Sequence, residues 1–285
     1  MEPLKIAIQK SGRLSEKSQE LIAECDIKII QGKRKLVGYS DDYPIEVLFL
    51  RDDDIPQYVA DGVADIGIVG ENEVLEKDKN VEIVKRLGFS KCRLSLAIPQ
   101  DINYSGTEWF NGKRIATSYP HILQKYLDEQ GVKATIEEIS GSVEIAPGIG
   151  LAEGIFDIVS SGGTLVSNRL KEVEVVIKSE AVIVSNTTLS KEKKALLEGL
   201  LYRMHTVQQS NGNKYILLNA PNEKLEEIIE ILPGMKSPTV LPLYEKGWSS
   251  IHSVVHEKEF WTIHEKLKNL GAEGILVIPI EKMIM

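Results

Sequence analysis

The chain has 285 residues, enough for two or three domains, and its 42% hydrophobic content can fill packed cores. Its 34 Lys and Arg against 42 Asp and Glu give a net charge of −8, which argues against broad attraction to nucleic acid or to anionic membrane. A strand pattern without a leader core opens the chain and no apolar run is long enough to span a bilayer, so we expect a cytoplasmic protein. Cys25 and Cys92 have neither metal-ligand nor disulfide spacing and are expected to be reduced, buried small apolar residues.

The first half of the chain alternates strand and helix patterns, which predicts an α/β architecture. The apolar run at 65–70 ends in glycine, so Glu71 and Asn72 follow the carboxyl end of a buried strand, where open α/β sheets bind ligands. The other elements expected here are strands at 4–8 and 45–49 and helices at 14–25 and 55–61.

A second unit of the same kind begins near Leu94, with a strand that Pro99 ends. An extended run at 174–184 is long enough to cross back to the first unit, and two α/β lobes joined in this way would enclose a cleft. Between these points we expect strands at 113–117, 134–139 and 155–159, a helix at 122–130 and a helical or turn segment at 146–153.

The remainder of the chain has a different order of predicted elements, beginning with a helix and a linker at 186–213. Strand patterns at 214–218, 239–244, 249–255 and 274–280 enclose helix patterns at 222–232 and 257–270. The resulting βαββαβ order is ferredoxin-like, an arrangement that serves as a small-molecule sensor or an oligomer contact.

The most informative stretch runs from Phe156 to Leu165, an apolar strand that breaks into a Ser-Ser-Gly-Gly-Thr turn opening a helix at 165–170. Gly162 and Gly163 let backbone N–H groups turn toward one anion, and the start of the helix adds partial positive charge. Asp157 precedes the turn and can accept hydrogen bonds from a sugar. Hydroxyl donors come from Ser160, Ser161 and Thr164.

These groups are what a phosphoribosyl group requires, although a plain strand–turn–helix joint, with Ser or Thr as helix cap, explains the same residues about equally well. The loop resembles the phosphoribosyl-diphosphate (PRPP) loops of phosphoribosyltransferases, with one departure. Those loops have two adjacent acidic residues before the turn, whereas Ile158 follows Asp157 here. We therefore expect the ribose site to be built on a different fold.

Further motifs are spread over essentially the whole chain. They are Gln9-Lys10-Ser11-Gly12-Arg13-Leu14, Arg51-Asp52-Asp53-Asp54-Ile55-Pro56, Asp61 to Asn72, Cys92 to Ala97, Asn111 to His121, Gly141-Ser142-Val143-Glu144, the phosphate loop, and Ile278 to Met283. In these motifs the chain resembles the long-form ATP phosphoribosyltransferase family, which begins histidine biosynthesis.

The resemblance implies that ATP and PRPP combine to give N1-(5-phosphoribosyl)-ATP and pyrophosphate, with Mg²⁺ required and histidine as feedback inhibitor. It also implies two periplasmic-binding-protein-like lobes, a C-terminal sensor domain, and a homo-oligomer that passes from dimer to hexamer. We expect residues 1–93 and 178–210 to form lobe I, 94–177 lobe II with the PRPP loop, and 212–285 the histidine-sensing domain.

Adenine N1 is unprotonated at neutral pH, so the reaction needs neither a side-chain nucleophile nor a general base. Catalysis is expected to depend on positioning and electrostatics, with Mg²⁺ held mainly by substrate phosphates. The resemblance implies Lys10 and Arg93 as electrostatic groups. It implies PRPP contacts at Asp157, Ser160, Ser161, Gly162, Gly163, Thr164, Leu165 and Glu144, ATP contacts at Arg13, Glu71, Asn72 and Tyr119, and histidine contacts near Asn219, Met235 and Thr239.

Several of these residues have a plainer interpretation. Glu144 and Glu71 can each serve a helix start, Lys10 with Arg13 can form a solvated basic turn, and Arg93 can be an exposed edge charge. Tyr119 and His121 can belong to a structural turn, and Glu153 is an alternative ribose contact.

Two other groups of residues contain metal-ligating side chain types, but neither pattern favours a metal site. Asp52-Asp53-Asp54 favours a helix N-terminus over a metal cluster, and His252, His256 and His264 lack the spacing of a zinc site.

A second class of function is a non-catalytic cleft protein, either a solute-binding protein or the effector half of a transcription regulator. The leaderless start disfavours the first, and the acidic balance with no helix-turn-helix disfavours the second.

Overall fold

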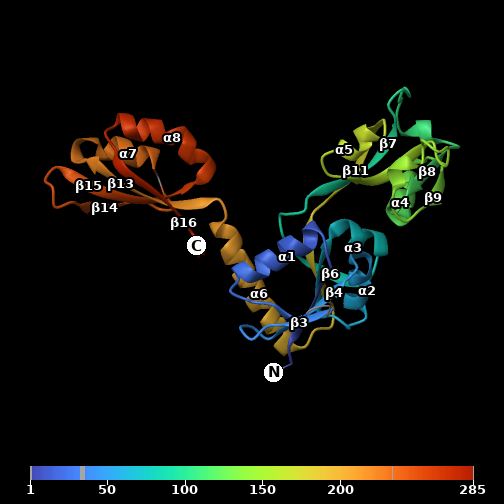
Figure 1. Ribbon diagram of the computed structural model, residues 1–285, viewed down its shortest axis with the longest axis horizontal. Coiled ribbons are helices and arrows are strands. Elements are labelled where there is room, and N and C mark those ends of the chain that lie inside the picture. The colour runs from blue at the N-terminus through green and yellow to red at the C-terminus, as the bar shows by residue number, and fades with distance from the viewer. Residues whose placement is uncertain (1, 33–35, 233, 285) are drawn as a thin grey trace. The chain divides into compact units, whose positions relative to one another are not determined.

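A computed structural model describes residues 2–32, 36–232 and 234–284. The chain forms two compact units, Met1–Glu198 and Gly199–Met285, and the first unit contains two α/β lobes (Figure 1).

Lobe I is built on a sheet with strand order β2-β3-β4-β1-β5-β12-β6. Strands β4, β1 and β5 are parallel, so their carboxyl ends meet at one edge, where Lys10, Arg51 and Glu71 follow them. Ile8 and Ile68 are fully buried, as expected for parallel strands covered on both faces. The bounds are β1 Leu4–Gln9, β2 Ile30–Gln31, β3 Val37–Tyr39, β4 Ile45–Leu50, β5 Ile66–Gly70, β6 Val81–Arg86, β12 Ala181–Asn186, α1 Arg13–Glu24, α2 Ile55–Ala60 and α3 Glu71–Lys77.

Lobe II has a sheet with strand order β11-β7-β10-β8-β9, in which β10 runs parallel to β8 and antiparallel to β7. Its core is built around the fully buried Phe110 and Phe156. The bounds are β7 Cys92–Pro99, β8 Arg114–Thr117, β9 Thr135–Glu138, β10 Gly154–Val159, β11 Leu170–Ser179, α4 Pro120–Gln130 and α5 Gly163–Ser167, with single-turn helices at Thr107–Phe110 and Val143–Ile145.

Two crossing segments join the lobes. Residues 87–91 connect β6 to β7, and Glu180 alone connects β11 to β12. The segments also bond to each other, because Leu87 N donates to Ala181 O at 2.9 Å and Ala181 N donates to Phe89 O at 3.0 Å. The expected fold of two α/β lobes joined by crossing strands, the periplasmic-binding-protein-like arrangement, is confirmed.

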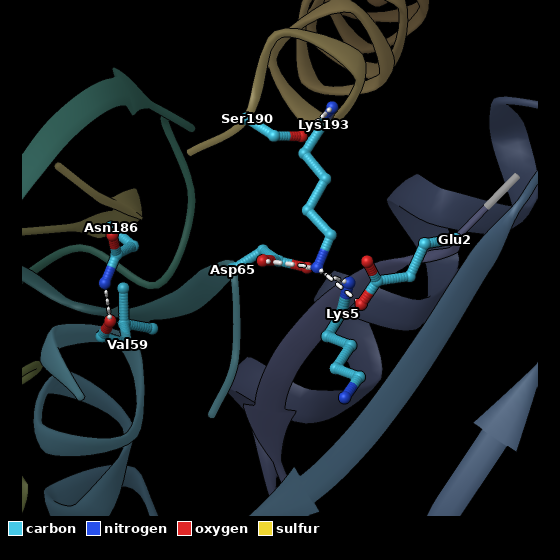
Figure 2. Close-up of polar contacts among 7 residues, drawn as sticks. All are labelled: Glu2, Lys5, Val59, Asp65, Asn186, Ser190 and Lys193. Atoms are coloured by element: carbon cyan, nitrogen blue, oxygen red, sulfur yellow. Dashed lines mark hydrogen bonds and ion pairs between the residues drawn. The ribbon is translucent and has the colours of Figure 1, made fainter. Parts of the chain in front are cut away.

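Helix α6 (Lys191–Ser210) is anchored to lobe I by its first turn (Figure 2). Lys193 Nζ lies 3.0 Å from the Asp65 carboxylate and 3.1 Å from Glu2 Oε1. Asp65 in turn accepts the backbone N–H of Lys5 at 2.8 Å, and only 7% of its side chain is exposed. Figure 2 also shows Asn186, the last residue of β12, bonded to the Val59 carbonyl at 2.7 Å.

The second unit contains the end of α6 and an antiparallel sheet with strand order β14-β15-β13-β16. Ile216, Ile228 and Leu267 are fully buried between this sheet and its two helices. The expected ferredoxin-like βαββαβ domain is confirmed. The bounds are β13 Asn213–Pro221, α7 Leu225–Ile231, β14 Thr239–Pro242, β15 Trp248–His256, α8 Glu257–Asn269 and β16 Glu273–Pro279.

Four local expectations need correction. The helix expected at 165–170 is α5, which ends at Ser167, because Leu170 already begins β11. The extended run at 174–184 is interrupted at Glu180. Cys92 is only half-buried, unlike the buried Cys25. Strands β2, β3 and β6 and helix α3 are additions to the expected elements.

Candidate active site

The Ser-Ser-Gly-Gly-Thr turn connects the carboxyl end of β10 to α5. Gly162 has φ 81°, in the left-handed region that glycine enters without strain. It is also the residue that precedes α5, and no side chain caps that helix. The serine-cap interpretation is therefore wrong. Ser160, Ser161 and Thr164 are exposed, whereas Leu165 is only 7% exposed and anchors the turn in the lobe II core.

Asp157 lies on β10, two residues before the end of the strand. Burial, together with the nearby negative charge of Glu144, raises the pKa of Asp157 to about 6, although the Ile158 N–H that it accepts acts in the opposite direction. Glu144 comes from the single-turn helix after β9, which follows Ser142 in the left-handed region. The fold thus places two carboxylates from different elements near enough for the charge of one to affect the other.

Arg93 joins the start of β7 to the turn at 160–164, called the phosphate turn below after the ligand expected from its sequence. In the β7–β10 ladder it is opposite Val159, and its Nη1 donates to the Ser160 carbonyl oxygen at 3.1 Å. Its Nε and Nη2 bind Glu172 Oε1 and Oε2 at 2.5 and 2.6 Å, and Ser95 Oγ donates to Oε1 at 2.6 Å. The pKa of Glu172 is lowered mainly by the Arg93 hydrogen bond. Arg93 is therefore not a free edge charge.

A cavity of about 660 Å³ lies where the crossing segments meet the phosphate turn. Basic side chains outnumber acidic ones in its wall, and Glu71 at the start of α3 forms an ion pair with Arg86 there. Burial is the main reason that the pKa of the Cys92 thiol is raised. The lining residues are Glu71, Arg86, Lys91, Cys92, Arg93, Ser160, Lys178, Ser179 and Glu180.

Asn72 and Tyr119 belong to a buried polar cluster rather than to the cavity wall. They are 5% and 8% exposed. The Tyr119 hydroxyl donates to Glu73 Oε1 at 2.9 Å and accepts from Asn72 Nδ2 at 3.2 Å. Ser179 Oγ donates to Asn72 Oδ1 at 2.8 Å. Burial raises the pKa of Glu73 to about 7, against the lowering effect of the Tyr119 hydrogen bond.

The other expected site residues are dispersed. Lys10 and Arg13 are exposed on lobe I after the carboxyl end of β1. Glu153 lies at the opposite end of β10 from the turn, and its hydrogen bonds and ion pair with Arg114 at 2.6 Å lower its pKa to about 2. It therefore does not join Asp157.

In the second unit, Asn219 on β13 is opposite Ser250 on β15, and Thr239 on β14 is opposite His252. Met235 is 52% exposed in the connection before β14. His252 accepts or donates a hydrogen bond of 2.6 Å with Tyr215, which occupies one of its ring nitrogens.

The placement of the acidic residues suits a metal ion that is bound mainly by the phosphate oxygens of a substrate and only to a small extent by the protein. Among the described residues, no group of three or more His, Cys, Asp or Glu is placed to hold a metal ion, and Asp52–Asp54 form a single helical turn. The Asp157–Glu144 pair beside the turn fits Mg²⁺, which prefers few carboxylates together with phosphate oxygens and water.

Three residues that hold expected site residues in place were not identified from the sequence. They are Ser95, Glu172 and Glu73. The alternation of β7 places Arg93 and Ser95 on one face, and this is the only signal that they act together. Glu172 and Glu73 find their partners 79 and 46 residues away. No local pattern identifies such contacts.

Comparison with known proteins assigns the chain with this two-lobed α/β fold to a class of pentosyltransferases. Residues 51–206 match the family model described as ATP phosphoribosyltransferase, and 210–282 match that of the HisG C-terminal domain. The ATP phosphoribosyltransferase of Bacteroides thetaiotaomicron is 64% identical over 282 residues, which are 99% of this chain and all of that protein. That of Cytophaga hutchinsonii is 59% identical over 281 residues, covering 99% and 98% of the two chains.

A solved structure, the ATP phosphoribosyl transferase (HisG:HisZ) complex from Thermotoga maritima, matches 71% of this chain and 96% of its own at 30% identity, with a TM-score of 0.63. The chain therefore belongs to the ATP phosphoribosyltransferase family, in its long form with the additional C-terminal domain, and is a transferase of histidine biosynthesis. Within the described ranges, no helix combines the length and apolar character needed to cross a membrane.

Proposed function

We propose that the chain transfers the 5-phosphoribosyl group of PRPP to N1 of ATP, giving N1-(5-phosphoribosyl)-ATP and pyrophosphate. The observation that carries this proposal is the pairing of Arg93 with Val159, which sets a guanidinium group against the exposed phosphate turn at the mouth of a cavity. An anion-binding turn, a neighbouring carboxylate and a space for a second ligand are what this reaction requires.

In this proposal the turn binds the 5′-phosphate of PRPP. Backbone N–H groups of Ser161 to Leu165 and the hydroxyls of Ser160, Ser161 and Thr164 supply the donors, and Gly162 and Gly163 allow close approach. Asp157, ionised above a pKa of about 6, accepts hydrogen bonds from the ribose hydroxyls, with Glu144 beside it.

ATP binds on the lobe I side, through Arg13 and Glu71. Lys10 and Arg93 stabilise the negative charge that develops on pyrophosphate as the bond to ribose C1 breaks. Because adenine N1 already carries its lone pair, no side chain removes a proton, and the contribution of the protein is alignment. Asn72 and Tyr119 act from behind the ATP site, since their polar atoms are already bonded to each other, to Glu73 and to Ser179.

Mg²⁺ is the proposed cofactor; Asp157 and Glu144 would lie near it, PRPP oxygens would supply most of its ligands, and when bound it would supply charge neutralisation for the leaving pyrophosphate. The chain's own residues orient the ribose and hold the phosphate.

The C-terminal domain, residues 212–285, is proposed to sense histidine as a feedback inhibitor at the edge formed by Asn219, Met235 and Thr239. The lobes are proposed as 1–93 with 178–210 and as 94–177. We further propose a cytoplasmic homo-oligomer that passes between dimer and hexamer. The match of 210–282 to a dedicated domain family supports a separate C-terminal domain, and the full-length relatives support its presence in the same chain as the two lobes.

The test follows the absorbance of phosphoribosyl-ATP in the presence of Mg²⁺ and pyrophosphatase as PRPP, ATP and then histidine are added. A signal that needs both substrates supports the reaction, and its loss on histidine addition supports the sensor. Binding of ATP without turnover would instead favour the non-catalytic cleft protein. Asp157→Asn, which alters the proposed ribose contact without changing side-chain size, should weaken the use of PRPP, and unchanged PRPP kinetics in this variant would contradict that contact.

A further inference from the structure

Helix α3 of lobe I contacts the start of α4 in lobe II at two points, one helical turn apart. At the first point, the hydroxyl of Tyr119, the residue before α4, is held by Glu73 and Asn72 at 2.9 and 3.2 Å. At the second point, Glu76 Oε1 and Oε2 accept the backbone N–H groups of His121 and Ile122, each at 3.0 Å. These residues, Asn72, Glu73, Glu76 and Tyr119 with the first turn of α4, are called the α3–α4 clamp below.

The second contact satisfies a requirement of the helix. The first N–H groups of an α-helix have no acceptor within the helix, and no side chain from the preceding residue caps α4. A carboxylate from the other lobe therefore takes the place of a local cap, and its negative charge suits the positive end of the helix dipole. The start of α4 is complete only when lobe I is in contact with it.

The clamp is connected to both sides of the proposed active site. Strand β8 pairs with β10, Thr117 opposite Phe156, so Tyr119 follows immediately beside the strand that carries Asp157. Burial and the charges of Glu73 and Asp157 raise the pKa of Tyr119, in agreement with this proximity. On the other side, Asn72 is bonded to Ser179, the residue before the Glu180 crossing.

We propose that the α3–α4 clamp is a positioning device that holds the ribose-binding edge of lobe II in alignment with the nucleotide side of lobe I. Glu73 and Glu76 are its positioning residues, and neither is among the residues that line the cavity. The catalytic part of this inference rests on the proposed function, whereas the contact itself does not.

The first test is hydrogen exchange of the full-length protein, measured for the amides of His121 and Ile122. Glu76→Ala and Tyr119→Phe are expected to accelerate exchange of these amides about tenfold, with no general acceleration elsewhere in lobe II. Glu73→Gln is the matched control, because its amide oxygen still accepts from Tyr119 and Asn72, and it should retain the protection. Unchanged exchange in Glu76→Ala and Tyr119→Phe would overturn the clamp, and Tyr119→Phe decides the matter if Glu76→Ala does not fold.

The second test separates alignment from binding. Since the phosphate turn lies within lobe II, Tyr119→Phe should lower kcat about tenfold while the KM for PRPP changes less than about twofold. Faster amide exchange with an unchanged kcat would overturn the positioning role. If the unaltered protein makes no phosphoribosyl-ATP, the proposed function fails, and the exchange experiment still decides whether the clamp exists.

Discussion

Arg93 and Glu172 form a bidentate ion pair, with Nε–Oε1 and Nη2–Oε2 distances of 2.5 and 2.6 Å. The remaining guanidinium nitrogen of Arg93, Nη1, donates to the Ser160 carbonyl oxygen. The orientation of one arginine thus links β11 to the first residue of the phosphate turn. Lysine carries the same charge but cannot make this planar set of contacts.

We therefore expect Arg93→Lys to lower kcat/KM for PRPP about tenfold, a change equivalent to about 1.4 kcal/mol. Steady-state kinetics with PRPP varied at saturating ATP measures it. Arg114→Lys is the matched control, because Arg114 forms a similar pair with Glu153 at the far end of β10. Equal effects of the two substitutions would contradict a specific role for Arg93 at the turn.

The raised pKa of Asp157 predicts a pH dependence of PRPP use. A protonated carboxyl loses acceptor capacity, so kcat/KM for PRPP should fall as the pH drops through about 6. Removing the negative charge of Glu144 by Glu144→Gln should lower the pKa of Asp157 and move the midpoint to lower pH. Profiles between pH 5 and 8 test this, and an identical midpoint in Glu144→Gln would show that another group controls the profile.

The raised pKa of Glu73 predicts that the free energy of unfolding depends on pH. Its pKa rises from 4.5 to about 7 on folding, so the folded state binds the extra proton between these values, and the free energy of unfolding falls as the pH rises from 4.5 to 7. The fall amounts to roughly 3 kcal/mol at most and ends above pH 7. The groups that act on Glu73 are Tyr119, Asp52, Asp53 and Lys77, and Glu73 itself acts on Cys92.

Glu73→Gln should remove this part of the slope. Urea denaturation at several pH values measures it, in a Trp248→Phe, Trp261→Phe background in which Trp109 reports on lobe II. The same slope with and without Glu73 would rule out its titration as the cause.

Lys193 is expected to matter for the stability of lobe I. Lys193→Met leaves the largely buried Asp65 carboxylate without its cation and should lower the free energy of unfolding by about 3 kcal/mol. Lys224→Met, which removes an exposed pair with Glu227, should change it by less than about 0.5 kcal/mol. Similar losses in both variants would mean that the Lys193 pair is no stronger than a surface ion pair.

The proposed histidine site predicts a separation of activity from inhibition. Thr239→Val and Asn219→Ala should leave the uninhibited rate unchanged and raise the histidine concentration needed for half inhibition. Tyr244→Ala, at a fully exposed position of the same unit, is the control. If both site variants respond to histidine like the unaltered protein, the sensor lies elsewhere.

Strong local patterns in the sequence predicted most of the fold. The apolar runs of β1, β5, β7 and β10, and the order of strands and helices after Asn213, were sufficient for two α/β lobes and a ferredoxin-like domain. The elements that were missed have weak patterns. β2 and β3 are two and three residues long, and β6 alternates poorly, with partly exposed residues along most of its length. Helix α3 was missed because its first residues, Glu71 and Asn72, follow the glycine that ends β5 and were interpreted only as ligand-binding residues after that strand.

The turn at 160–164 could be predicted because the residues that form it are consecutive in the sequence. The partners of Arg93, Asn72 and Tyr119 could not, because they depend on which strands become neighbours. Asn72 and Tyr119 were expected to contact ATP, yet folding brings both against Glu73, a buried carboxylate that only the contact between α3 and α4 explains.

The single residue Glu180 between β11 and β12 limits how the lobes can move. One residue cannot lengthen appreciably, and its neighbours on both sides are bound in different sheets. Together with the hydrogen bonds between Ala181 and residues 87 and 89, this excludes a large separation of the lobes by translation and leaves rotation about the crossing segments. A rotation of one lobe relative to the other about these segments would therefore give the largest displacements far from Glu180 and the smallest at the cavity wall, which includes Glu180.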